Sequence, residues 1–260
     1  METAHALPKP RNARPGSTSD QPPGADADRP VQRLARATGL LYLVLAVFGM
    51  FSPMVLESLV VPGDAQATAD SILGSRWLFG SSLVTWLAIV IADVAISVTF
   101  YLLLRPVSHA LSLLAAALRL VYSAVLAAVV LHLFDAFRLL TGAQGAAGLG
   151  EQQRQATALA ALDTFSAGFL LALVLFGVHL LTLGYLLYRS RYLPRVLGAL
   201  LVAAGVGYVV DSLAGLLVAD HGGLVRVVLL TPAVAGELGL TAWLLLRGVR
   251  MPRPVTRRAG

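Results

Sequence analysis

Six long apolar stretches constrain this chain more than any other feature of its sequence. Each has about 20 residues or more, the length that a helix needs to cross the hydrocarbon core of a bilayer. A backbone in hydrocarbon must satisfy its own hydrogen bonds, so each stretch is predicted to be a helix. The predicted fold class is therefore all-α, a polytopic transmembrane helix bundle with six spans. The spans cover approximately residues 37–60, 77–104, 108–133, 164–188, 196–218 and 224–246.

Composition excludes several other classes of protein. Hydrophobic residues make up 57% of the 260 residues, charged residues make up only 13%, and the mean hydropathy is +0.76. A soluble domain usually carries about 25% charged residues, which it needs to cover its surface. The chain has no cysteine, which excludes disulfides, thiolate metal sites and cysteine nucleophiles.

The distribution of basic residues predicts an orientation in the membrane. Fifteen Lys and Arg residues lie in the two tails and in the loops after the second and fourth spans, whereas four lie in the alternate loops. Because cytoplasmic loops carry the excess of positive charge, we expect both termini in the cytoplasm and a multi-pass location in the inner (plasma) membrane. The net charge of +6 is explained by membrane lipids as partners, and no nucleic-acid recognition motif accompanies it.

The segments outside the spans differ in character. Residues 1–35 are rich in Pro and polar residues and are predicted to be a disordered cytoplasmic tail, residues 36–249 form the six-helix transmembrane domain, and residues 250–260 form a basic cytoplasmic tail. In the segment 61–76, Asp64 is suited to cap a short interfacial helix. The segment 134–163 ends in a sequence that can extend the fourth span beyond the membrane.

Five ionisable residues lie deep inside the predicted spans, where a charge costs about 2.5–3.5 kcal/mol on insertion scales. They form a candidate buried polar cluster, which comprises Asp93, Arg119, His179, Asp211 and Glu237. Asp93 lies eleven residues before the end of its span at Leu104, and Arg119 lies eleven residues after the start of the next span at Ser108. Because a short connection around Arg105-Pro106 joins the two spans, both residues should sit at the same depth on neighbouring helices. We therefore predict an Asp93–Arg119 ion pair. Four further residues, Glu57, His132, Asp135 and Asp163, lie near the outer ends of the spans.

Each of these polar features has a functional and a structural interpretation. Asp93 belongs to a polar stripe on one helix face, which either lines a path for water or substrate or holds helices together. Glu237 is either a carboxylate that binds a proton or cation or a hydrogen-bonded structural residue. His179 is interpreted as structural, because a haem site would need a second His at its depth, so no cofactor and no metal is expected. The 26-residue spacing shared by Asp93–Arg119 and Asp211–Glu237 is compatible with an inverted repeat, although the flanking residues do not match.

The loop between the fourth and fifth spans is a candidate site for lipid headgroups. Its basic and aromatic residues, Arg189, Arg191, Tyr192 and Arg195, suit an anionic membrane surface. The alternative is that this loop only determines topology.

No catalytic signature supports an enzyme. The sequence Gly80-Ser81-Ser82 is followed by Leu83 and Val84, so it does not complete a nucleophile elbow. Zinc-protease, phosphate-loop and dinucleotide-binding motifs are also absent from the sequence.

Several segments together resemble a known family. They are RATGLLYLVLAVFG at 36–49, DVAISVTFYLLLRPV at 93–107, the pair Arg119-Leu120, FGVHLLTLGYLLYRSRYLPRVLGALLVAAGVGYVVD at 176–211 and GELGLTAWLLLRGV at 236–249. This pattern, which covers about residues 33–250, is similar to the bacterial membrane family called domain of unknown function 4386. The resemblance implies an integral membrane protein of uncharacterised activity, and it carries over no catalytic residue.

Two functional hypotheses follow from the residues. The first is a non-catalytic membrane scaffold or regulatory partner whose polar groups hold the bundle together. The alternative is a small transporter or carrier that takes a small molecule or ion at the buried cluster, and an intramembrane enzyme ranks behind both. A solvent-connected cavity that reaches Glu237 would favour transport, whereas a closed polar cluster would favour the scaffold. The sequence carries no signal for a particular oligomeric state.

Overall fold

Seven α-helices and no strand occupy the part of the chain that the computed structural model describes, which is residues 25–142, 148–190, 192–218 and 223–249. Six of these helices are long and apolar enough to cross a membrane, and the short α2 is the exception. This confirms the predicted all-α fold class and its six spans. The helices are α1 (Ala25–Leu59), α2 (Ala65–Gly74), α3 (Arg76–Leu104), α4 (His109–Leu140), α5 (Glu151–Ser190), α6 (Arg195–Leu217) and α7 (Gly223–Leu246).

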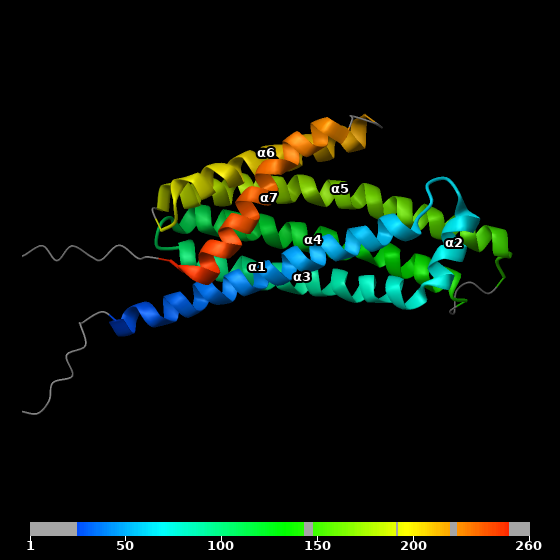
Figure 1. Ribbon diagram of the computed structural model, residues 1–260, viewed down its shortest axis with the longest axis horizontal. Helices are drawn as coiled ribbons and strands as arrows, with labels where there is room; N and C mark the ends of the chain where they lie inside the picture. Colours follow the sequence, from blue (N-terminus) through cyan, green and yellow to red (C-terminus); the bar gives the residue numbers. More distant parts are fainter. Residues whose placement is uncertain (1–24, 143–147, 191, 219–222, 250–260) are drawn as a thin grey trace, which may run out of the picture.

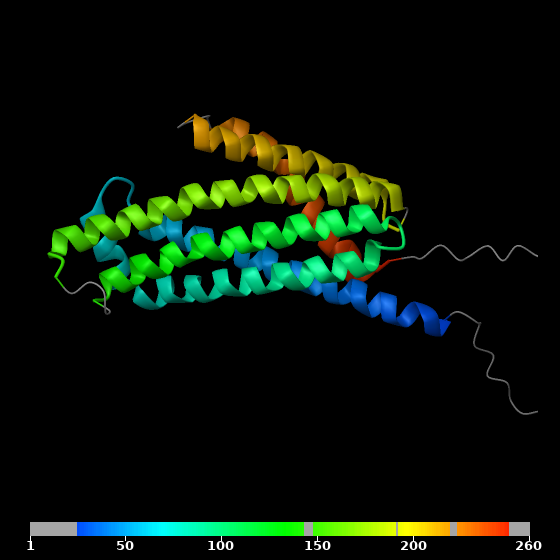
Figure 2. The same ribbon diagram turned by 180° about the vertical axis from the view of Figure 1, so that it is seen from behind.

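The long helices form one elongated bundle (Figures 1 and 2). From α3 to α7 each helix packs on the next one along the chain, and α1 packs on α3 and α7. The start of α1 and the end of α7 lie at the same end of the bundle, here called the terminal end, and α2 lies at the opposite end, the α2 end (Figure 1). An even number of spans produces this arrangement. Which end faces the cytoplasm stays a prediction.

The first helix begins earlier than predicted. Residues 25–35 belong to α1, so the prediction of a disordered tail is wrong for them, whereas residues 1–24 and 250–260 lie outside the described part of the chain. This segment gains contacts with the far end of the sequence: Ala35 is buried, and the Gln32 Nε2 atom donates a hydrogen bond to the Val249 carbonyl oxygen. Packing against the end of α7 thus offsets the entropic cost of ordering a polar segment.

Two predictions for the α2 end are confirmed. The Asp64 carboxylate caps α2 by accepting a hydrogen bond from the Ala67 backbone N–H at 2.9 Å. Helix α5 begins at Glu151, thirteen residues before the predicted start of its span at Thr164, so it does extend beyond the apolar stretch.

Glycines bring α5 and α6 into backbone contact. A Cβ atom added at Gly184 would lie 2.8 Å from the Gly198 carbonyl oxygen, and one added at Gly205 would lie 2.6 Å from the Gly177 carbonyl oxygen. Real Cβ atoms essentially never approach other atoms so closely, so these positions require glycine. The four residues lie seven apart on each helix and define the glycine seam. Small residues allow this kind of close approach between membrane helices.

Helices α3 and α4 are joined differently, through side chains. The Ser97 hydroxyl on α3 donates a hydrogen bond to the Ala116 carbonyl oxygen on α4 at 2.9 Å. In return, the Ser112 hydroxyl on α4 donates to the Tyr101 carbonyl oxygen on α3 at 3.0 Å. The turn at residues 105–108 keeps the two helices adjacent and fixes which residues share a depth.

Candidate functional site

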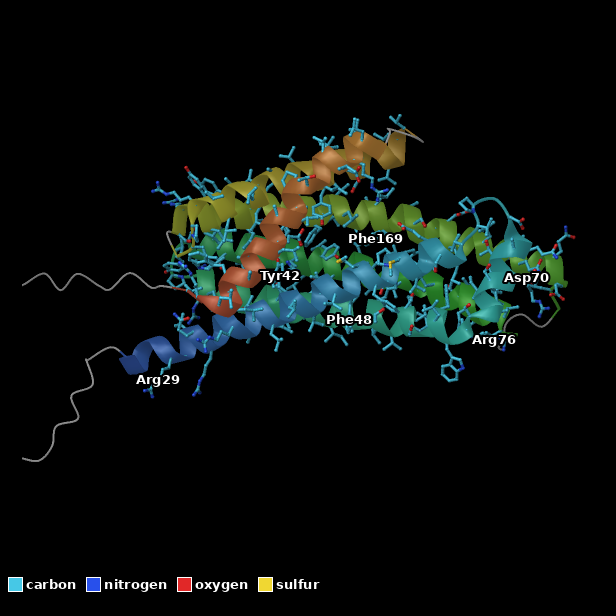
Figure 3. The ribbon with its side chains drawn as sticks, in the orientation of Figure 1. Arg29, Tyr42, Phe48, Asp70, Arg76 and Phe169 are labelled. Atoms are coloured by element: carbon cyan, nitrogen blue, oxygen red, sulfur yellow. The ribbon has the colours of Figure 1, made fainter. Side chains whose placement is uncertain are left out.

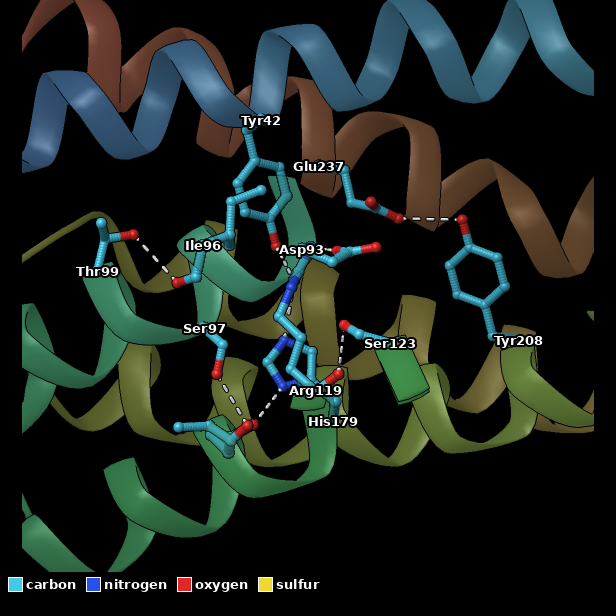
Figure 4. Close-up of polar contacts among 12 residues, drawn as sticks. Tyr42, Asp93, Ile96, Ser97, Thr99, Arg119, Ser123, His179, Tyr208 and Glu237 are labelled. Carbon is cyan, nitrogen blue, oxygen red and sulfur yellow. Dashed lines mark hydrogen bonds and ion pairs between the residues drawn. The ribbon is translucent and has the colours of Figure 1, made fainter. Parts of the chain in front are cut away.

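A buried ion pair occupies the middle of the bundle. The Arg119 Nη2 atom on α4 donates to the Asp93 Oδ1 atom on α3 at 2.5 Å, and both side chains are 0% exposed (Figure 4). The predicted Asp93–Arg119 pair is therefore confirmed, and the reason is the equal distance of the two residues from the turn that joins α3 and α4. A charge in a low-dielectric interior requires a partner of this kind.

The other terminal nitrogen of Arg119 contacts two further helices. Its Nη1 atom donates to the Tyr42 hydroxyl oxygen on α1 at 2.8 Å and lies 3.1 Å from His179 Nε2 on α5. Because a guanidinium group has donors only, Nε2 must accept, which places the imidazole hydrogen on Nδ1. The Nδ1–H group then donates to the Ala115 carbonyl oxygen at 2.8 Å. Both ring nitrogens of His179 are thus engaged, which supports its structural interpretation.

Aromatic rings surround the Arg119 guanidinium group. Its Cζ atom lies 5.0 Å from the centroid of the Tyr42 ring and 5.4 Å from that of Phe176. Phe176 also packs on Tyr122 and Tyr208, with centroid distances of 5.0 Å and 5.3 Å. Ring faces attract a cation, so this enclosure stabilises the charge where water is excluded.

Glu237 on α7 is connected to this region through Tyr208. The Tyr208 hydroxyl on α6 donates to Glu237 Oε1 at 3.1 Å (Figure 4). The Glu237 carboxyl group is also close enough to Arg119 and Asp93 to interact with both electrostatically. Glu237 is half-buried, whereas Arg119 and Asp93 are fully buried.

Each of the six long helices therefore supplies one polar side chain to a common layer. We call this set the polar layer, and its members, in chain order, are Tyr42, Asp93, Arg119, His179, Tyr208 and Glu237. Sequence reasoning missed the two tyrosines. A signal was present for Tyr208, which lies in the middle of its span, although tyrosines in membrane proteins concentrate at the interface.

Two atoms at the centre of the layer have no hydrogen-bond partner among the described residues. They are Asp93 Oδ2 and Arg119 Nε, which are both buried. The ion pair is thus held by one contact between Nη2 and Oδ1, and it leaves one acceptor and one donor unused. The layer therefore contains a buried ion pair in which each residue keeps one polar atom without a hydrogen bond.

Asp211 was predicted to belong to the buried cluster, and the structure places its ion pair elsewhere. Its Oδ2 atom lies 3.7 Å from the Nε atom of Arg226, near the α2 end of the α6–α7 hairpin. Asp211 is buried, whereas the Arg226 side chain is largely exposed. Asp211 lies three residues further toward the α2 end than Tyr208, where Arg226 at the start of α7 can reach it. We therefore leave Asp211 out of the polar layer.

The predicted headgroup loop is only partly accessible. Arg189 and Arg195 are exposed at the terminal end, and the Arg195 guanidinium carbon lies 5.8 Å from the centroid of the Tyr188 ring. Tyr192 is buried instead, so its inclusion in a headgroup site is wrong; burial also raises the pKa of its hydroxyl above the ordinary value. Arg191 lies outside the described residues. Binding of headgroups by Arg189 and Arg195 stays a prediction.

The fold and the polar layer define a class of protein: a polytopic α-helical membrane protein with a charge pair sealed inside its bundle. Residues 37–248 match the family described as Domain of unknown function (DUF4386), and the chain belongs to this family. An uncharacterized protein of Archaeoglobus fulgidus is 30% identical over 175 residues, which are 67% of this chain and 88% of that protein. No solved structure matches the chain. The family resemblance predicted from the sequence is therefore confirmed.

Proposed function

We propose that this protein is a non-catalytic membrane scaffold or regulatory partner, in which the polar layer fixes the six long helices in one arrangement. The observation that carries this proposal is the burial of four of the layer's six members. Arg119 and Asp93 are 0% exposed, and Tyr42 and His179 are each 1% exposed. Lipid cannot replace a lost hydrogen bond, so any helix that slides out of register leaves a polar group without a partner.

The surface cavities support the same proposal. Three examples among the described residues are a cavity near Glu57 and Asp163, one along α7 from Arg226 to Leu238, and one beside Arg29 on α1. No member of the polar layer lines any of these three cavities. None of these three cavities therefore reaches Glu237, which supports a scaffold over a transporter.

A thermal-stability screen of the purified full-length protein in detergent tests the proposal. The probes are sodium, potassium, chloride, phosphate and acetate, with the Asp93→Leu/Arg119→Leu double variant as the control. We expect no probe to raise the Tm of the unmodified protein by more than it raises the Tm of the double variant. A stabilisation by one probe that disappears in the double variant would contradict the scaffold proposal.

One observation favours the carrier as a second candidate. Asp93 Oδ2 and Arg119 Nε are a buried acceptor and a buried donor without a hydrogen-bond partner among the described residues, and Glu237 is the least buried charged member of the layer. A small polar molecule that both donates and accepts hydrogen bonds would satisfy both atoms. For this candidate the same screen, repeated with glycine and urea as probes, should show a stabilisation that Arg119→Leu abolishes.

A further inference from the structure

A cavity of about 300 Å³ lies at the α2 end of the bundle, between α1 and α5. Its walls are mainly apolar and come from three helices: Leu56 and Val60 from α1 and its end, Leu133 from α4, and Leu162 and Phe165 from α5. In Figure 1, α7 crosses α1 toward the terminal end, so it does not run between the α2-end halves of α1 and α5. The cavity therefore has α4 as its floor and is not covered by α7. We call it the acidic groove.

Two carboxylates line this otherwise apolar cavity. Glu57 projects from α1 and Asp163 from α5, and both are exposed. No basic residue lines the cavity with them. Neither carboxylate forms an ion pair or a hydrogen bond with another described residue, in contrast to Asp93 and Asp211. Two negative charges thus face a cavity whose walls cannot neutralise them.

Phe165 is the one aromatic residue among those that line the groove, and two further rings pack behind it. Phe165 stacks on Phe169 at a centroid distance of 5.8 Å, and the Trp86 ring meets both edge-on, at 5.3 Å from Phe165 and 5.2 Å from Phe169. These ring contacts hold Phe165 in place as part of the apolar wall. A pocket of this size with apolar walls and a few polar groups is typical of small-molecule sites.

We propose that the acidic groove binds an organic cation with an apolar body. The apolar walls suit the body, and Glu57 and Asp163 supply the opposite charge, so anions and neutral analogues should bind weakly. An inorganic cation is a poorer fit, because the walls add little oxygen, and the described part of the chain holds no group of three metal-ligating side chains. This inference goes beyond the scaffold proposal and does not depend on the polar layer.

Equilibrium dialysis of the full-length protein in a zwitterionic detergent tests the groove. The probes are tetraphenylphosphonium, its anionic isostere tetraphenylborate, and neutral triphenylphosphine oxide. We expect saturable binding of the phosphonium ion, at least tenfold tighter than that of either control probe. Asp163→Asn and Glu57→Gln should each weaken this binding several-fold, and Asp163→Glu should retain it.

The matched control variant is Asp70→Asn. Asp70 is an exposed carboxylate on α2, at the same end of the molecule but outside the groove lining (Figure 3). Its loss should leave phosphonium binding unchanged. Glu57 and Asp163 are exposed and have no partner among the described residues, so their variants should fold, which an unchanged Tm would verify. Equal binding of cation and anion, an equal effect of Asp70→Asn, or displacement by millimolar Mg²⁺ would each overturn the proposal.

Discussion

The bundle contains two antiparallel hairpins, α3–α4 and α5–α6, whose helices are held together by different kinds of contact. The first hairpin is joined through side chains, by the Asp93–Arg119 ion pair and by serine hydroxyls that bond across the interface. The second is joined through the glycine seam, where backbone atoms touch. Both side chains of a contact between two helices can be substituted together. A contact with a backbone atom cannot be relieved in this way, because no substitution removes the backbone atom. The two hairpins should therefore differ in whether a second substitution can repair the first.

Loss of one member of the ion pair should have the largest effect. Arg119→Leu leaves the Asp93 carboxylate buried and unpaired, and breaking a buried pair in this way costs about 3–5 kcal/mol of unfolding free energy. The double change Asp93→Leu/Arg119→Leu should recover a substantial part of this loss, because no charge then stays behind. The measurement is the fraction of folded protein as a function of denaturing detergent. A double variant no more stable than the single variants would show that the pair is not an isolated joint.

The glycine seam should respond more moderately but without repair. Gly184→Ala places a methyl group against Gly198 O and Val202 N, and overpacking of this kind costs about 1–3 kcal/mol. The two nearest atoms are backbone, and the Val202 Cγ2 atom follows at 3.0 Å, so a smaller side chain at position 202 would relieve only the least severe of the three contacts. Folded fraction should therefore fall, and Val202→Ala should not restore it.

Gly168 provides the matched control for this prediction. A Cβ atom added there would meet the Val129 Cγ1 atom on α4, which is a side-chain atom and not a backbone atom. Gly168→Ala should thus destabilise the protein, and Val129→Ala should rescue it. Rescue of Gly184→Ala by Val202→Ala to the same extent would mean that α5 and α6 are not joined by their backbones.

The difference between the two joints also explains what the sequence could predict. The Asp93–Arg119 pair was predictable because a short turn fixes the relative depth of both residues. The positions of Tyr42 and Tyr208 were not, since they depend on how α1 and α6 rotate about their axes, and packing between helices distant in the chain sets that rotation. The same holds for residues 25–35, whose stabilising contact with Val249 spans 217 positions.

The Tyr208–Glu237 contact links α6, and so the hairpin with the glycine seam, to α7. Tyr208→Phe removes the donor to Glu237 Oε1 and should cost about 1 kcal/mol, the value typical of one hydrogen bond. Tyr185→Phe is the control, because Tyr185 is exposed on α5. Denaturation in detergent should separate the two variants. Equal stability of both would indicate that Glu237 is not held by Tyr208.

The smallest expected effect concerns the hydroxyls between α3 and α4. Ser97→Ala removes the donor to the Ala116 carbonyl oxygen, and hydrogen bonds between membrane helices are worth about 0.6 kcal/mol on average. Thr157→Ala is the control, since the exposed Thr157 hydroxyl bonds only within its own helix, to the Gln153 carbonyl oxygen. In the Asp93→Leu/Arg119→Leu background, the loss caused by Ser97→Ala should stay the same if the hydroxyls and the ion pair act independently. A larger loss of stability in that background would mean that the serine hydroxyls hold α3 and α4 together once the charges are gone. The ion pair and the hydroxyls would then stabilise the hairpin cooperatively and not independently.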